Sequence, residues 1–254
     1  FTVMIFFRVF VVLVISTSAL GQSVRQHTTN SNGWYMYFGD HKVSSKWGVH
    51  LEAQFRRHDV ITSWQQLLLR TGINYHLTDQ TFLTAGYAFI QTYPYGEFPV
   101  AAAFPEHRLW QQAQIKSQLR KWEMISRFRL EQRWQYLPVE QTDGSFAPGE
   151  AVYQNRFRIF TRFSIPFAGE TIEEKSWYVT FYDEVFISFG ENVKMNVFDQ
   201  NRAYVALGYR IPKVGRLEFG YLNQLVLKSN GTQVESNHTL QLGLISNIPF
   251  FKQP

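Results

Sequence analysis

The stretch from Trp122 to Tyr136 alternates between two kinds of side chain, and this period of two predicts an extended strand. One set is mostly charged, namely Glu123, Ile125, Arg127, Arg129, Glu131, Arg133 and Gln135, and the other is mostly apolar, namely Trp122, Met124, Ser126, Phe128, Leu130, Gln132, Trp134 and Tyr136. The apolar set has aromatic residues at both ends, and the charged set is more ionic than a solvated surface needs. This pattern is typical of a transmembrane barrel strand, with lipid on one side and a wet lumen on the other.

The length of this stretch also suits a membrane. At about 3.3 Å per residue, the chain from Trp122 to Trp134 covers roughly 40 Å. A tilt of about 45° reduces this to roughly 28 Å along the membrane normal, close to the thickness of the hydrocarbon layer. We therefore expect Trp122 and Trp134 at the two membrane interfaces, where amphipathic rings are favoured.

The same alternation recurs along the chain, although residues 34–38 are too few to assign a facing. Ten further segments are visible, at residues 34–38, 47–57, 63–75, 82–90, 106–119, 153–165, 177–189, 201–211, 216–228 and 238–248. In the segment 177–189 the register leaves Asp183 facing lipid, so the sequence predicts either a β-bulge near Asp183 or an interface position, and leaves the choice open. The segments together predict an all-β fold, a transmembrane antiparallel up-and-down barrel.

Loop lengths indicate an orientation. The long connections 91–105, 138–150, 190–199 and 229–237 mostly alternate with short ones at 77–80, 119–121 and 212–215, and 166–175 is the exception. Long loops belong outside the cell and short turns in the periplasm. With this orientation, the segment at Trp34 runs from the cell exterior toward the periplasm. A periplasmic N-terminus then requires one more strand, running outward, from the polar lead at residues 22–33. Since an even count is expected, we predict twelve strands, with ten as the alternative.

The N-terminus has the features of a secretory signal. Arg8 precedes an apolar run from Val9 to Ile15, and small residues, Ala19 and Gly21 among them, follow it. We expect residues 1–21 to be a cleaved signal peptide and residues 22–254 to form the barrel, with an uncleaved membrane anchor as the alternative.

Composition narrows the classes of protein. Aromatic residues make up 17% of the 254 residues, but no second apolar run is long enough for a membrane helix. The absence of cysteine excludes disulfides, thiol catalysis and thiolate metal sites. The net charge of +5 is compatible with nucleic-acid binding, but the arginines alternate with lipid-type residues and form no exposed stripe, so no nucleic-acid partner is expected.

The inward charges are the candidate site. The predicted lumen-lining or anion-interacting residues are Arg56, Arg70, Arg108, Arg127, Arg129, Arg133, Arg156, Arg158, Arg162, Arg202, Arg216, Glu52, Glu131, Glu184 and Glu218, with Glu123 as a further carboxylate. In one hypothesis their cross-strand ion pairs fill a narrow lumen and are structural. In the other, arginine exceeds carboxylate by roughly two to one, and the positive lumen passes small anions.

An enzyme is a third hypothesis. An outer-membrane lipid hydrolase needs a serine nucleophile with a histidine base. The candidates are His50, His107, His238 and Ser236; Ser236 and His238 share a strand face, but Asn237 points away and no acidic partner lies nearby in the sequence. The seven histidines are scattered, so no metal site and no cofactor are predicted.

A set of motifs also resembles a known family. The motifs are Phe104-Pro105-Glu106-His107-Arg108-x-Trp110-Gln111-Gln112, Arg127-x-Arg129-Leu130-Glu131-x-Arg133, Arg156-x-Arg158, Glu184, Gln200-Asn201-Arg202 and Gly208-Tyr209. Between Trp34 and Leu244 the chain resembles uncharacterised Gram-negative outer-membrane barrels, catalogued as a domain of unknown function. The resemblance implies the fold and the location and carries over no catalytic residue. We expect a monomer in outer-membrane lipid, delivered there by the barrel-assembly machinery, for which the terminal aromatics Phe250 and Phe251 are a candidate signal.

Overall fold

The computed structural model describes residues 25–251, and every regular element in this range is a β-strand. The predicted signal peptide lies outside the described residues. The strands are β1 (Gln26–Lys42), β2 (Trp47–His58), β3 (Ser63–His76), β4 (Thr81–Thr92), β5 (Phe104–Leu119), β6 (Trp122–Gln135), β7 (Pro138–Glu140), β8 (Phe146–Pro148), β9 (Val152–Pro166), β10 (Trp177–Phe189), β11 (Phe198–Ile211), β12 (Gly215–Leu227) and β13 (Gln233–Ser246). No helix in this range is long and apolar enough to cross a membrane.

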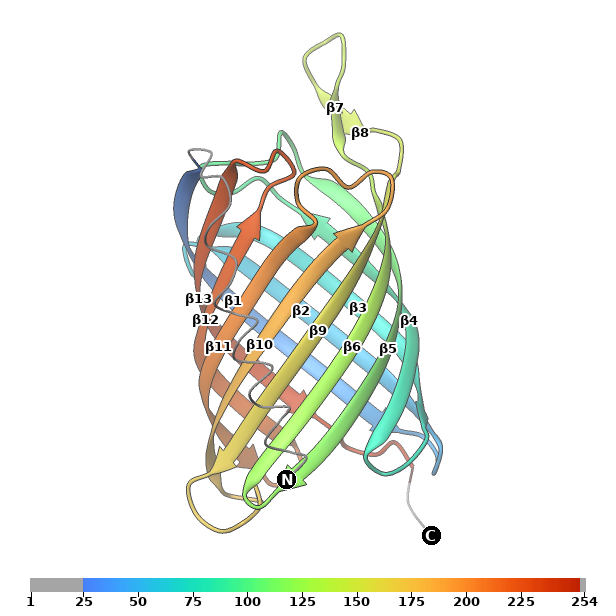
Figure 1. Cartoon of the computed structure of the whole chain (residues 1–254), viewed down its shortest axis with the longest axis vertical. Coiled ribbons are helices and arrows are strands. Elements are labelled where there is room, and N and C mark those ends of the chain that lie inside the picture. The colour runs from blue at the N-terminus through green and yellow to red at the C-terminus, as the bar shows by residue number, and fades with distance from the viewer. Residues whose placement is uncertain (1–24, 252–254) are drawn as a thin grey trace, which may run out of the picture.

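Eleven strands close into one barrel, in the order β1-β13-β12-β11-β10-β9-β6-β5-β4-β3-β2, while β7 and β8 form a separate hairpin. Each barrel strand overlaps one of the eleven segments predicted from alternation, so the closed all-β barrel is confirmed. The hairpin stands beyond one end of the barrel, on the connection between β6 and β9 (Figure 1).

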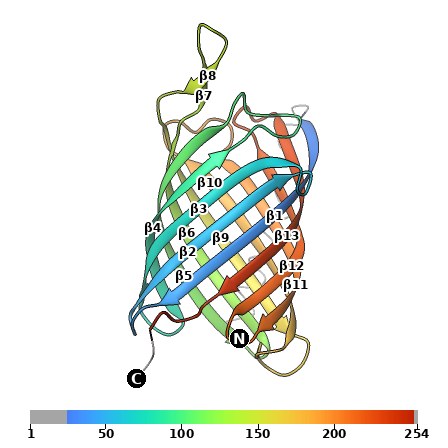
Figure 2. The ribbon, with the colours of Figure 1, turned by 180° about the vertical axis from the view of Figure 1, so that it is seen from behind.

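The predicted strand count and the purely antiparallel order are corrected. The polar lead does not form a twelfth strand, because residues from Gln26 onward extend the first strand instead. With an odd number of alternating strands the first and the last must run in the same direction, and β1 pairs with β13 in parallel, from Gln26 opposite Gln233 to Gly39 opposite Ser246 (Figure 2). A barrel of 19 strands is known, so an odd count is compatible with closure.

The two faces of the sheet differ as predicted. Outward positions on strands around the barrel carry exposed apolar side chains such as Leu69, Leu109, Val205 and Leu242. Inward positions carry buried charged, amide and aromatic side chains. An eight-stranded barrel is just wide enough for side chains to fill its interior, so eleven strands leave additional room that arginine, tryptophan and tyrosine occupy.

Aromatic residues gather on the outer face near both strand ends. On β6, Trp122 lies 6.1 Å from Phe163, centroid to centroid, and Trp134 at the opposite end lies 5.2 Å from Tyr153. The end of the barrel that holds the short turns, which we call the short-turn end, also carries the Trp177–Tyr209 pair, with ring centroids 4.8 Å apart. Aromatic pairs therefore lie near both ends of an outer face that is largely apolar between them.

Asp183 faces outward, and its carboxylate accepts a hydrogen bond of 2.9 Å from the Asn201 side chain. The register shift between β10 and β11 falls at Phe186 and Ile187, three residues beyond Asp183, and the extra residue is Asp199 on β11, so no bulge lies at Asp183 itself. The connections at 93–103, 136–151, 190–197 and 228–232 lie at one end of the barrel, which we call the long-loop end; β1 begins there.

Candidate functional site

All the arginines and glutamates predicted to line the lumen lie at inward-facing positions. The registers place some like charges directly opposite each other, because Arg108 faces Arg133 and Arg129 faces Arg158 across neighbouring strands. Like charges at such positions repel. The Glu106 carboxylate offsets the repulsion between Arg108 and Arg133, because it accepts hydrogen bonds from Arg108 Nε at 2.5 Å and Arg133 Nε at 2.6 Å.

Glu131 is the centre of the interior network and has no exposed surface. Its Oε1 accepts from Arg158 Nη1 at 2.8 Å and Arg70 Nη2 at 3.3 Å, and its Oε2 accepts from Arg156 at 2.7 and 3.0 Å. Arg108 Nη1 lies 3.6 Å away. Because Arg70 comes from β3 and Glu131 from β6, this carboxylate connects strands that are not neighbours in the barrel.

A second carboxylate, that of Glu184 on β10, contacts three arginines. Its Oε1 accepts from Arg127 at 2.9 Å and from Arg158 at 2.7 and 3.1 Å, and Arg202 Nη1 lies 3.7 Å from Oε2. Arg158 therefore bonds both Glu131 and Glu184. The remaining ion pairs of the predicted residues are Glu52 with Arg70, Glu218 with Arg162, and Glu123 with Arg216.

Aromatic rings pack against several of these guanidinium groups. Phe186 has the guanidinium carbons of Arg158, Arg202 and Arg156 at 4.5, 4.7 and 5.1 Å from its ring centre. Trp34 has those of Arg56 at 4.0 Å and Arg202 at 5.0 Å. Ring faces attract cations, so these stacks stabilise guanidinium groups that have been removed from water.

Sequence reasoning missed four interior carboxylates. Asp40 accepts a hydrogen bond from Asn74 and pairs with His50, Glu106 bridges two arginines, Asp199 accepts from Arg156 Nη1 at 2.8 Å, and Glu235 pairs with Lys228 at 2.6 Å. Glu106 shares the strand parity of Arg108, so its facing could have been found. These groups reduce the arginine excess that the sequence suggested.

Two cavities occupy the interior. One, of about 240 Å³, lies at the long-loop end, and we call it the upper chamber. The other, of about 150 Å³, lies toward the short-turn end, and we call it the lower chamber. Four side chains line both cavities and so lie at the boundary between them, which we call the partition: Gln54, Arg70, Arg158 and Arg202.

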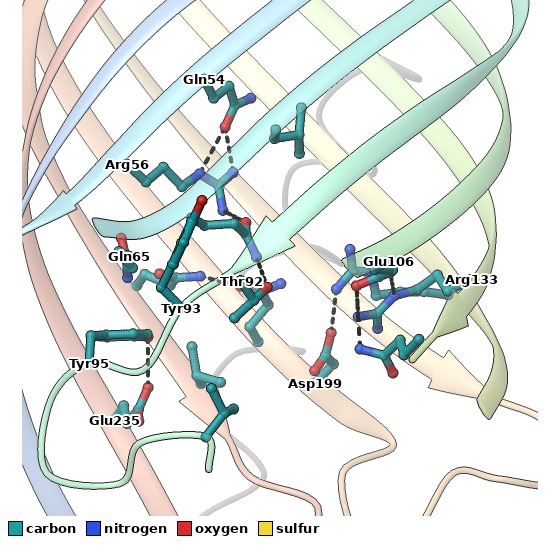
Figure 3. Close-up of a pocket in the computed structure, with 18 of the residues that line it drawn as sticks. Gln54, Arg56, Gln65, Thr92, Tyr93, Tyr95, Glu106, Arg133, Asp199 and Glu235 are labelled. Carbon is teal, nitrogen blue, oxygen red and sulfur yellow. Dashed lines mark hydrogen bonds and ion pairs between the residues drawn. The ribbon is translucent and has the colours of Figure 1, made fainter. Parts of the chain in front are cut away.

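The upper chamber is lined from opposite walls of the barrel and from a loop. Figure 3 shows Arg56 on one side and Glu106 with Arg133 on the other. Phe98 and Tyr95, from the loop between β4 and β5, lie over it, and the Tyr95 hydroxyl donates to Glu235 on β13 at 3.1 Å. Loss of hydration and the nearby Glu235 charge raise the pKa of Tyr95 well above its usual range.

The hydrolase candidates are not brought together. His50 lies inside the barrel between Asp40 and Glu52, whereas His107 and His238 are bonded to outward-facing tyrosines, Tyr87 and Tyr221 respectively. Ser236 lies outward and accepts from Asn223 Nδ2 at 3.2 Å. Ser236 and His238 thus have different partners. Within residues 25–251, no group of three or more histidine, aspartate or glutamate side chains is arranged to hold a metal ion.

Fold and interior define a closed β-barrel with an arginine-rich, ion-paired lumen. The chain belongs to the family described as "Protein of unknown function (DUF2490)", whose model matches residues 31–235. No curated protein and no solved structure matches the chain. The predicted membership of a family of unknown function is thereby confirmed.

Proposed function

We propose that this protein is a Gram-negative outer-membrane barrel whose lumen is closed by its own ion pairs, so that it acts as a membrane-embedded scaffold and not as an open pore. The observation that carries the proposal is the partition between the two chambers. Arg70 and Arg158 on this partition are held to the same buried oxygen, Oε1 of Glu131, and Arg158 is also held by Glu184. A water-filled path would have to break these contacts, at the cost of leaving buried charges unpaired.

The membrane placement is supported by the outer face. A largely apolar outer face with aromatic pairs near both ends matches the lipid-facing surface of outer-membrane barrels. The exposed large apolar side chains occur around the barrel and not in one patch; Ile73 is 60% exposed on β3 and Phe219 is 58% exposed on β12. A soluble protein rarely exposes so much apolar surface.

Labelling in whole cells tests the placement and the orientation. The chain has no cysteine, so a single introduced thiol can be labelled selectively. Thr142→Cys lies in the connection carrying the β7–β8 hairpin, and Lys121→Cys lies in the short turn between β5 and β6. A membrane-impermeant maleimide should label Thr142→Cys in intact cells and Lys121→Cys only after the outer membrane is permeabilised. Equal labelling of both in intact cells would contradict the proposed orientation.

A narrow anion-preferring channel is the second candidate function. It is favoured by Arg56 and Arg129, which have no carboxylate within 4.0 Å among the described residues. Rings of arginine line many anion pores. Planar-bilayer recording separates the two functions: a closed scaffold gives no current above that of the bare bilayer, whereas a channel gives a current whose reversal potential in a salt gradient shows anion preference.

A further inference from the structure

Two arginines on the wall of the upper chamber are weakly neutralised by the network, because Arg56 has no carboxylate partner and Arg202 has only a distant one. Arg56 gives its donors to amide oxygens only, to Gln54 at 2.9 Å and Gln66 at 2.7 Å. Arg202 has its nearest carboxylate oxygen, on Glu184, at 3.7 Å, and its Nε is buried without a hydrogen-bond partner. Both side chains are more than nine-tenths buried.

The two guanidinium groups share one support. Both lie over the Trp34 ring, which is fixed in turn by its hydrogen bond of 2.7 Å from Nε1 to Gln65. The indole face stabilises cations but adds no negative charge. A buried cation without a close counter-charge is costly, and a bound anion would supply that charge.

The upper chamber has room for such an anion. A water molecule occupies about 30 Å³ of liquid, so a cavity of about 240 Å³ holds roughly eight waters or one compact ionic group. Cations outnumber carboxylates on its lining, where eight arginines and lysines face Glu106, Asp199 and Glu235. The Tyr95–Glu235 pair and Phe98 line the cavity on its long-loop side.

We propose that the upper chamber binds a compact oxyanion of the phosphate class between Arg56 and Arg202. This inference rests on the proposed function, in which the partition prevents the chamber from being part of a continuous channel. A guanidinium group presents two parallel donors that match phosphate oxygens, and two guanidinium groups balance the two charges of a phosphate monoester. The chamber is too small for an oligosaccharide.

Calorimetric titration of the full chain in detergent with inorganic phosphate tests the site. Wild type should bind phosphate, and Arg56→Gln and Arg202→Gln should each weaken binding at least tenfold. The matched control is Arg129→Gln, because Arg129 also stacks on an indole, that of Trp110 at 4.6 Å, and also bonds an amide, that of Gln112, but lines the lower chamber. Its phosphate affinity should stay within twofold of wild type.

Several outcomes overturn the proposal. They are the absence of phosphate binding by folded wild type, or an equal loss in Arg129→Gln and Arg56→Gln. Arg56→Lys guards against misfolding, because it keeps the charge and loses the paired donors, and it should bind with intermediate affinity. If both substitutions to glutamine fail to fold, competition provides the test: sulfate should displace phosphate from wild type, and the absence of displacement contradicts the site.

Two further probes distinguish the possible sources of the phosphate group, a lipid head group and a soluble phosphate ester. Tighter binding of dihexanoyl phosphatidate than of glycerol 3-phosphate supports the site and assigns it to a lipid head group, and equal binding supports the site and assigns it to a soluble phosphate ester. The planar-bilayer recording distinguishes this inference from the proposed function. A conducting barrel contradicts the closed scaffold, whereas a silent barrel that binds no phosphate contradicts only the anion site.

Discussion

Glu131→Gln is the substitution that tests the interior network most directly. The wild-type carboxylate uses both oxygens, one for Arg158 and Arg70 and the other for Arg156. Glutamine has nearly the same volume but replaces one acceptor oxygen by an NH₂ donor. In either amide orientation, donor hydrogens then face a guanidinium group, and a negative charge that several arginines share is lost.

The expected cost is large because Glu131 is fully buried. Removing one partner of a buried ion pair typically costs about 3–5 kcal/mol. Arg156 retains Asp199 and Arg158 retains Glu184, so the lower part of this range, about 3 kcal/mol, is the more reasonable expectation. For a chain of this size about 1 kcal/mol shifts the melting temperature by roughly 2–4 °C, so the expected decrease is roughly 6–12 °C.

The assay is thermal unfolding of the detergent-solubilised barrel, followed by circular dichroism. Glu123→Gln is the control, because the Glu123 side chain is 24% exposed and pairs only with Arg216. A partly solvated pair is worth about 1 kcal/mol or less, so this variant should melt within roughly 4 °C of wild type. If the two variants melt at the same temperature, the central role of Glu131 is refuted.

Three further predictions concern the wall, the loop and the outer face. Gly208→Ala places a Cβ 2.2 Å from the Tyr178 ring, which must move, so a loss of about 1–3 kcal/mol should be measured by thermal unfolding. Tyr95→Phe tests the loop: the Tyr95 pKa is raised in the fold above its unfolded value near 10, so this hydroxyl contributes stability that is complete below about pH 10 and is lost as the pH rises. The melting temperature of wild type should therefore fall more steeply than that of Tyr95→Phe between about pH 9 and pH 11. Asp183→Leu replaces an outward carboxylate by an apolar group. If this face contacts lipid, the variant should be about 1 kcal/mol more stable in lipid vesicles, and its folding yield there should rise.

Matched variants make these three predictions specific. Gly243→Ala adds a Cβ that meets nothing within 4 Å, and it should melt close to wild type. Tyr93→Phe removes a hydroxyl from the same loop and is the matched control for Tyr95→Phe. Asp143→Leu changes an exposed loop carboxylate and should leave the folding yield unchanged. A parallel change in any variant and its control would contradict the corresponding argument.

Much of the barrel is predictable from the sequence because the two faces of each strand contact different environments. Where apolar and charged residues alternate, as in β6 and β9, the register and facing follow directly. The same contrast is missing at the start of β1, where the outward His27, Thr29 and Ser31 are polar like their inward neighbours. The sequence alone therefore indicates a polar lead in the first half of β1, and the predicted strand count and purely antiparallel closure are wrong.

The partners of the interior charges were less predictable. Alternation shows that Glu131 and Arg70 face inward, but their contact crosses the lumen between β6 and β3, and depends on how the sheet closes. Asp199 was hidden for a local reason: the register shift of β10 lies opposite it, so Asp199 and Gln200 are both buried and the period of two is interrupted. Glu235 was assigned to a loop because β13 begins five residues earlier than the apolar alternation suggests.

The interior also explains why arginine, and not lysine, dominates the lumen of this barrel. A guanidinium group can bond a carboxylate along one edge, a second carboxylate along another, and still lie flat on a ring. Arg158 does all three, with Glu131, Glu184 and Phe186. Lysine, a point charge on a flexible stem, can provide only the first two, without fixed geometry. In the proposed closed scaffold the side chains must cross the lumen and stay fixed, so closure would depend on the shape of the guanidinium group as much as on its charge.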